Sequence, residues 1–354
     1  MRFNLGRSWL TATALAYVAM VYTGVAASAS VSDALDRPSI ALAATLHPFL
    51  LGASQAGSRL VVVGERGVVM LSDDGGVSWQ QSPTPTSVTL TGVSFADDTH
   101  GFAVGHGGVV LATHDAGATW ERRLDGREIA RQLLADAERS GDERRISQAQ
   151  RFIEDGPDKP LLDLLVLDAS HIIVVGAFGL ALSSYDGGRS WVSWKESLDN
   201  AMELHLYAIR ARGALLVVAG EQGLVRISDD AGKTFSTITT PYNGSFFTLE
   251  LMGDNEILLA GMRGNVWRSR NRGQTWQQME TPAPASIVAS RLSPEGTLVL
   301  VSQAGQLLTE RGGVLHERLR QPLPQLNGVW VKPDASLLLL GQQGARIVEA
   351  GDLK

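Results

Sequence analysis

The chain of 354 residues contains no cysteine, which excludes disulfide bonds, cysteine-based zinc sites and thiol catalysis. Aromatic residues make up only 6% of the sequence, and no block of lysine and arginine stands out against a formal net charge of −6. Because binding of nucleic acid needs clustered positive charge, we expect no such partner. The seven histidines lack the H-x-H and H-E-x-x-H spacings, so we expect neither a metal site nor a cofactor.

Glycine, by contrast, is abundant at 38 residues, and it alternates with short runs rich in valine and leucine. This pattern indicates many turns and therefore β structure.

The N-terminus has the pattern of an export signal. Arg2 and Arg7 precede an uncharged, mostly apolar run at 9–27, and Ala27-Ser28-Ala29 gives an A-x-A cleavage pattern. We predict that residues 1–29 are a cleaved signal peptide, or alternatively an uncleaved anchor, since the run is long enough to span a bilayer. Both alternatives predict an exported, periplasmic protein, which the anchor would tether to the membrane.

Seven self-similar segments follow along the chain. In the first five, a G-x-x-G pattern is followed five residues later by Ser or Thr, at positions 72, 113, 184, 228 and 269. A unit of about 41 residues with four short apolar runs is typical of a β-propeller blade. The predicted fold class is therefore all-β, with a seven-bladed propeller over residues 37–351. Since the last copy lacks a fourth run, we expect the segment 37–43 to supply the missing strand of blade seven.

One interval between copies is long, because positions 113 and 184 are 71 residues apart. The extra residues, about 124–158, contain apolar positions at helical spacing over 126–139 and again over 142–154, separated by Ser140-Gly141. We predict a helical hairpin inserted between blades two and three. It either covers one propeller face or docks a partner by its amphipathic surface.

The first five copies carry the box S/T-x-D-x-G-x-S/T-W/F between their third and fourth predicted strands, with Asn271 in place of Asp in the fifth copy. The Asp can accept backbone N–H bonds as in an Asx-turn, the Gly permits a positive φ, and the aromatic residue can pack between blades. Five copies around a ring cannot form one active site, so we assign these residues a structural role. The box positions are Ser72, Asp74, Gly76, Trp79, Thr113, Asp115, Gly117, Trp120, Ser184, Asp186, Gly188, Trp191, Ser228, Asp230, Gly232, Phe235, Ser269, Asn271, Gly273 and Trp276.

The opposite face, formed by the G-x-x-G turns and the blade-to-blade crossovers, is where we expect function, because loops on a rigid scaffold carry binding residues. His205 is either structural or catalytic, and the aromatic group at 242–247 belongs either to the core or to a partner contact. The candidate partner-binding residues are Glu65, Arg66, His106, Phe178, His205, Glu221, Gln222, Tyr242, Phe246 and Arg263.

The inner-strand patterns at 92–120 and 163–191, together with the boxes, resemble the photosystem II assembly/stability-factor-like propellers with Asp-box (bacterial neuraminidase) repeats, over roughly residues 45–350. This resemblance implies a non-enzymatic, exported factor that assists assembly of a membrane complex. Nothing in the sequence indicates photosynthesis, so we expect a relative from outside phototrophs. It would be a monomeric periplasmic scaffold for an inner-membrane complex or transporter.

The alternative is a sialidase-like glycoside hydrolase acting on exported or surface glycans, because Asp boxes also occur in sialidases. Such an enzyme needs two carboxyl groups about 5–9.5 Å apart. The best-placed pair, Glu65 and Glu221, lies in blades one and four, about 154° apart by sevenfold division. No arginine trio accompanies them. We therefore expect no enzymatic activity.

Overall fold

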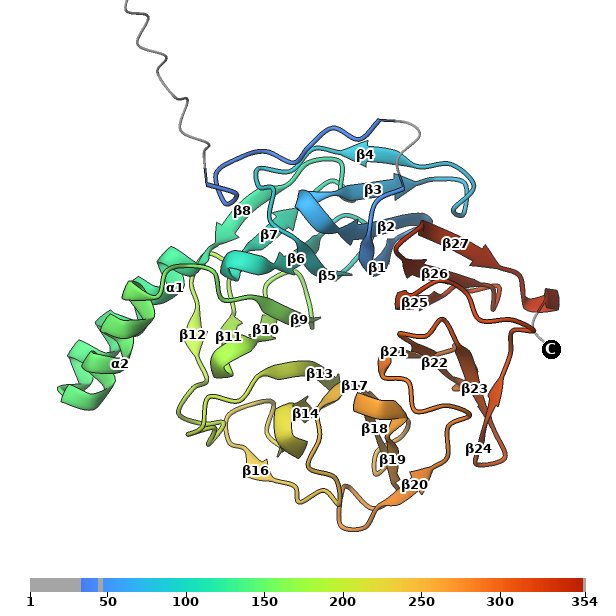
Figure 1. Cartoon of the computed structure of the whole chain (residues 1–354). Helices are drawn as coiled ribbons and strands as arrows, with labels where there is room; N and C mark the ends of the chain where they lie inside the picture. Colours follow the sequence, from blue (N-terminus) through green and yellow to red (C-terminus); the bar gives the residue numbers. More distant parts are fainter. Residues whose placement is uncertain (1–32, 44–46, 353–354) are drawn as a thin grey trace, which may run out of the picture. The chain divides into compact units, whose positions relative to one another are not determined.

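The computed structural model describes residues 33–43 and 47–352 and contains seven antiparallel sheets arranged as blades around a centre, as Figure 1 shows. This confirms the predicted seven-bladed propeller with a helical insertion. The predicted signal peptide or anchor, residues 1–29, lies outside the described residues. Within the described part of the chain, no helix is both long and apolar enough to cross a membrane.

Each of the first six blades has four strands in chain order from the centre outward, whereas blade seven has three. The strands of blades one to three are β1 (Leu50–Ala56), β2 (Arg59–Gly64), β3 (Val69–Ser72), β4 (Gln80–Ser82), β5 (Leu90–Phe95), β6 (Gly101–Gly105), β7 (Val110–Thr113), β8 (Glu121–Leu124), β9 (Leu161–Val166), β10 (Ile172–Gly176), β11 (Ala181–Ser184) and β12 (Val192–Ser193). Those of blades four to seven are β13 (Leu206–Arg212), β14 (Leu215–Gly220), β15 (Val225–Ser228), β16 (Ser236–Thr237), β17 (Phe246–Leu251), β18 (Ile257–Gly261), β19 (Val266–Ser269), β20 (Gln277–Met279), β21 (Ile287–Leu292), β22 (Leu298–Ser302), β23 (Leu307–Arg311), β24 (Val314–Glu317), β25 (Leu326–Val331), β26 (Leu337–Gly341) and β27 (Gly344–Val348).

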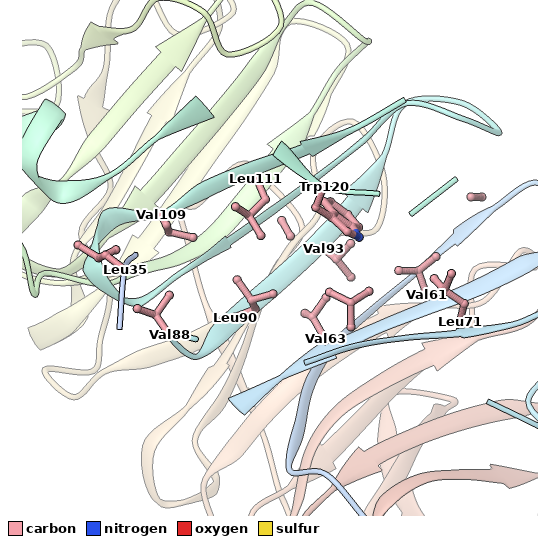
Figure 2. Packing of buried hydrophobic residues seen from close by; sticks show 13 residues of the cluster. Leu35, Val61, Val63, Leu71, Val88, Leu90, Val93, Val109, Leu111 and Trp120 are labelled. Carbon is pink, nitrogen blue, oxygen red and sulfur yellow. The ribbon is translucent and has the colours of Figure 1, made fainter. Parts of the chain in front are cut away.

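The core consists of separate apolar layers between neighbouring blades. The second strand of each blade is buried almost throughout, because both of its faces meet an adjacent blade. Figure 2 shows the layer between blades one and two, where Trp120 lies near Val93 and faces Val61 and Leu71 of blade one. The ring closes in the same way, since blade one shares an apolar layer with blade seven and Asn327 Nδ2 donates to Leu50 O at 3.1 Å.

The segment 37–43 does not complete blade seven, and that expectation is wrong. Its hydrogen bonds go to blade one, where Ser39 N donates to Thr84 O at 3.0 Å and Leu42 N donates to Gln81 Oε1 at 2.9 Å. The preceding residue Leu35 is 2% exposed in the layer between blades one and two. Burial of Leu35 and the hydrogen bonds to Gln81 of β4 and to Thr84 hold this segment on blade one. It therefore lies on the blade-one side of the ring closure and not on blade seven.

The boxes lie at the turns between the third and fourth strands. In the first box, Asp74 Oδ1 accepts from Ser72 Oγ at 2.8 Å and from Ser78 N at 2.9 Å, while Gly76 N donates to Ser72 Oγ. Hydrogen bonds from Ser78 hold the pKa of Asp74 well below its usual range. Asn271 replaces Asp in box five and keeps the turn, because its Oδ1 accepts from Ser269 Oγ at 3.0 Å and from Thr275 N of the same box at 2.9 Å.

The insertion forms a hairpin of α1 (Gly126–Ser140) and α2 (Glu143–Glu154). Asp125 and Asp142 cap the two helices by accepting backbone N–H bonds, and Gly141 ends α1 in the left-handed region with a φ of 68°. In Figure 1 the hairpin extends outward beside blades two and three rather than across the centre of the ring. It therefore does not cover the propeller face.

The start of α1 is fixed to the ring by charge as well as by burial. Asp36 accepts from the Arg127 guanidinium at 2.8 and 2.9 Å and from Arg122 at 3.2 Å. These hydrogen bonds, that of Arg127 foremost, lower the pKa of Asp36 to about 2. Ile129, only 1% exposed, packs beneath them in the layer between blades two and three.

Candidate functional site

The face opposite the boxes, which we call the crossover face, carries a tight turn between the second and third strands of each of the first five blades. These turns are η1 (Glu65–Gly67), η2 (His106–Gly108), η3 (Ala177–Gly179), η4 (Glu221–Gly223) and η5 (Met262–Gly264). The middle residue of each has a positive φ, which favours glycine. Blade two has Gly107 there, but the other four blades keep Arg66, Phe178, Gln222 and Arg263 at φ values of 53° to 57°.

A side chain larger than glycine in this conformation costs about 1–2 kcal/mol. All four of these large side chains are exposed on the crossover face. These four side chains are therefore available for contact with a partner.

An aromatic row crosses the crossover face from blade three to blade five. The Phe178 ring meets His205 edge-on at a centroid distance of 5.1 Å, His205 meets Tyr207 at 6.2 Å, and Tyr207 meets Phe247 at 5.2 Å. Phe178 is 47% exposed, so its ring is open to a partner. Burial, followed by the charge of Glu221, raises the pKa of the Tyr207 phenol.

His205 has a structural position in this row. Phe178 N donates to His205 Nδ1 at 3.0 Å, so this ring nitrogen accepts and carries no proton. Glu221 Oε2 accepts from the backbone N of His205 at 3.1 Å. The imidazole thus fixes the η3 turn and the orientation of the exposed Phe178 ring, which favours the structural alternative for this histidine.

At its outer end the row meets a cavity of about 340 Å³ between the hairpin and blade three. Lys159 lies in its wall with a side chain only 5% exposed. Its Nζ donates to Gly156 O at 3.0 Å and sits 4.5 Å from the Phe152 ring centroid and 5.9 Å from that of Phe178. This ammonium links the hairpin to the aromatic row by cation–π contacts.

At its inner end the row reaches the central channel, a cavity of about 480 Å³ that Tyr207 and Phe247 help to line. Charged side chains cross this channel. Arg210 Nη1 lies 2.6 Å from Asp163 Oδ2, and Arg210 Nε lies 4.0 Å from Glu250. Burial alone would lower the pKa of Arg210, but these two carboxylates outweigh it and the pKa is raised. Arg210 is thus balanced within the channel by these two carboxylates.

The structure brings some of the predicted candidate residues together and separates others. Phe178, His205 and Glu221 form one cluster, whereas Glu65 lies in blade one, three blades away. Phe246 is fully buried between blades four and five, so its proposed partner contact is wrong. Tyr207 is not among the partner-binding residues that the sequence indicates. Alternation of buried and half-buried residues along an inner strand is the signal that could have indicated it.

The site has little of what an enzyme or a metal centre needs. Glu65 and Glu221, the best-placed acids for a glycosidase, belong to different turns, and Glu221 is engaged with His205. Within residues 33–43 and 47–352, no three His, Asp or Glu side chains gather closely enough to hold a metal ion. The arrangement of an exposed Phe178 ring, half-buried neighbouring rings and a polar rim suits contact with another polypeptide.

A family model described as "Photosynthesis system II assembly factor YCF48" matches residues 46–124, 77–153 and 143–314. Among curated protein sequences, none is significantly similar to the chain.

Solved structures are similar at low identity. YCF48 from Cyanidioschyzon merolae is 13% identical with a TM-score of 0.64, and the match covers 86% of this chain and 96% of that chain. The WD40 propeller domain of Doa1 is 13% identical with a TM-score of 0.64, covering 90% and 98%. A structure of YCF48 bound to a D1 peptide is 21% identical with a TM-score of 0.47, covering 54% of this chain and 63%, less than two thirds, of that chain. The matches to YCF48 from Cyanidioschyzon merolae and to the Doa1 domain show the propeller fold.

Proposed function

Because the chain belongs to the family of the photosystem II assembly factor YCF48, we propose that it is a non-enzymatic scaffold that binds a segment of a client protein while a membrane complex is assembled or stabilised. One YCF48 structure is described as bound to a D1 peptide. We extend this kind of partner, a peptide segment, to the present chain. The proposed client is an inner-membrane complex or transporter, and it need not be a photosystem.

The aromatic row carries the proposal. It joins the cavity beside the hairpin to the central channel, and its outer ring, Phe178, is 47% exposed. Aromatic side chains contribute most to protein interfaces, because a rigid ring buries a large apolar area at a small entropic cost. The exposed Gln222 and Arg263 on the turns of blades four and five supply a polar rim.

Affinity purification from mildly crosslinked membranes tests this proposal. The full chain is expected to recover a defined membrane complex. Phe178→Ala removes the exposed ring and is expected to lose that complex, with an affinity reduced by about tenfold or more. Tyr185→Ala is the matched control, because Tyr185 is 58% exposed in the box turn of the same blade, on the opposite face.

Equal recovery by the Phe178→Ala and Tyr185→Ala proteins would remove the aromatic row from the interface. Failure to recover any membrane complex, together with cleavage of a glycan by the purified chain, would support the glycosidase instead.

We also propose that the protein works in the periplasm, on the basis of the export pattern in residues 1–29. Mass spectrometry of the protein from fractionated cells tests this. A periplasmic species that has lost residues 1–29 indicates a cleaved signal, and a full-length species in the membrane fraction indicates an anchor. A full-length species in the cytoplasm would refute export.

A further inference from the structure

Blade seven differs from the other six blades because it has three strands. Its outermost strand β27 pairs with β26 on one side, and no described residue pairs with the other side. By strand register, residues 345–347 of blade seven correspond to residues 69–71 of blade one. In blade one, residues 69–71 pair with β4. An open strand edge of this kind is a template for another strand.

A cavity of about 350 Å³ lies at the junction of blades six and seven, where β27 ends. Val299 and Thr309 line it from blade six, and Val331 and Leu337 line it from blade seven. Apolar side chains thus form one part of its lining, beside polar and charged ones, and the cavity lies next to an incomplete sheet.

The equivalent place between blades one and two holds an aromatic side chain. By strand register, the lining positions Val299, Thr309 and Val331 correspond to the residues around Trp120, namely Val61, Leu71 and Phe95. These residues pack on the Trp120 indole, which Figure 2 shows between the two blades. In blades one to five this aromatic residue immediately precedes the fourth strand, whereas Gly313 holds that position in blade six. The cavity is thus the place that the aromatic residue of a fourth strand would take in blade seven.

A buried donor supports the same conclusion independently. Arg318 holds the register position of Ser82 in blade one, since its N–H donates to Leu307 O at 2.8 Å. Ser82 Oγ donates across the junction to Ala118 O, a box carbonyl of blade two, at 3.0 Å. Arg318 Nε is buried in the wall of the cavity and has no hydrogen-bond partner among the described residues. A carbonyl of a fourth strand would satisfy it.

The chain's own segment 33–43 does not fill this place, because its hydrogen bonds hold it on blade one. The charged residues of the lining are Arg311, Arg318, Glu295 and Glu310, and Glu310 is paired with Arg268 at 3.5 Å.

From the open edge, the cavity and the unpaired donor, we propose that blade seven is completed by an extended segment of a partner protein. This segment adds to β27 as a fourth strand and inserts an aromatic side chain between blades six and seven. The site is distinct from the aromatic row on the crossover face and does not depend on it.

The probe is a synthetic peptide of residues 113–124, THDAGATWERRL, which is the box and fourth strand of blade two. Titrated into the full chain and followed by fluorescence anisotropy of a peptide label, it is expected to bind saturably. The same peptide with its tryptophan replaced by alanine is expected to bind at least about tenfold more weakly. Equal binding of both peptides, or no saturable binding of either, would overturn the proposal.

Thr309→Phe fills the cavity from blade six and is expected to abolish peptide binding without lowering the melting temperature. Thr237→Phe, an exposed position on the outer strand of blade four, is the matched control and is expected to bind as the unchanged chain does. Light scattering identifies a different occupant. A doubled mass that returns to the monomer value in Thr309→Phe would assign the place to a second copy of this chain and overturn the partner proposal.

Discussion

Replacement of Trp120 by alanine tests how the blades are held together. The side chain is 8% exposed, and its Nε1 donates to Gly117 O at 2.9 Å. A buried indole removes roughly 200 Å² from water, worth about 5 kcal/mol at about 25 cal/mol per Å². The conformational entropy that the side chain loses on folding opposes this stabilisation by about 1 kcal/mol. We therefore expect Trp120→Ala to lower the free energy of unfolding by about 4 kcal/mol, within the range of about 3–5 kcal/mol for large aromatic truncations.

Urea unfolding followed by far-UV circular dichroism measures this change without relying on tryptophan fluorescence. Trp120→Phe keeps most of the apolar contact but leaves Gly117 O unpaired, so we expect a smaller loss of about 1–2 kcal/mol. Trp276→Ala is the comparison in blade five, where the ring is only partly buried, and roughly half of the Trp120 effect is expected. A loss below about 1 kcal/mol for Trp120→Ala, with an unchanged m-value, would refute the view that these rings hold neighbouring blades together.

Three further predictions concern charge. A hydrogen bond from Ser190 is the main cause that lowers the pKa of Asp186 from 3.8 to about 2, and one from Thr234 does the same for Asp230. The stabilisation that these carboxylates provide is therefore fully present above about pH 4 and is lost as the pH falls toward 2. A melting temperature that stays the same across that range would contradict this prediction. Asp36→Ala is expected to speed hydrogen exchange in α1 while exchange in β14 stays the same, and equal rates in α1 would show that the ion pairs do not fix the hairpin. Glu250→Ala removes one carboxylate from the channel and is expected to cost about 1–3 kcal/mol in urea unfolding, since Arg210 keeps Asp163; a gain in stability would show that Glu250 is not needed.

Local signals along the chain determined most of the fold. The repeated Ser/Thr, Asp and Gly of each box specify one turn through contacts within seven residues, as the Asp74 bonds show. The hairpin was equally readable, because its caps Asp125 and Asp142 and the break at Gly141 act on adjacent backbone groups. The number of blades followed from counting copies.

Tertiary structure decided what depends on contacts between distant segments. The path of 37–43 was mispredicted because alternation in sequence does not distinguish the edge of blade one from that of blade seven. Phe246 and Phe247 are neighbours on one strand, yet only the first faces the core, and register fixed that choice.

The aromatic row of the candidate site and the open edge of β27 in blade seven both result from how distant segments of the chain pack together. Phe178, Tyr207 and Phe247 come from three blades and meet only because the ring closes. The sequence by itself determined the blades and their turns, since those rest on short-range hydrogen bonds and on a regular apolar pattern. The tertiary structure decided which aromatic rings form one surface, and it decided that segment 37–43 does not complete blade seven, because both are set by packing between segments far apart in the chain.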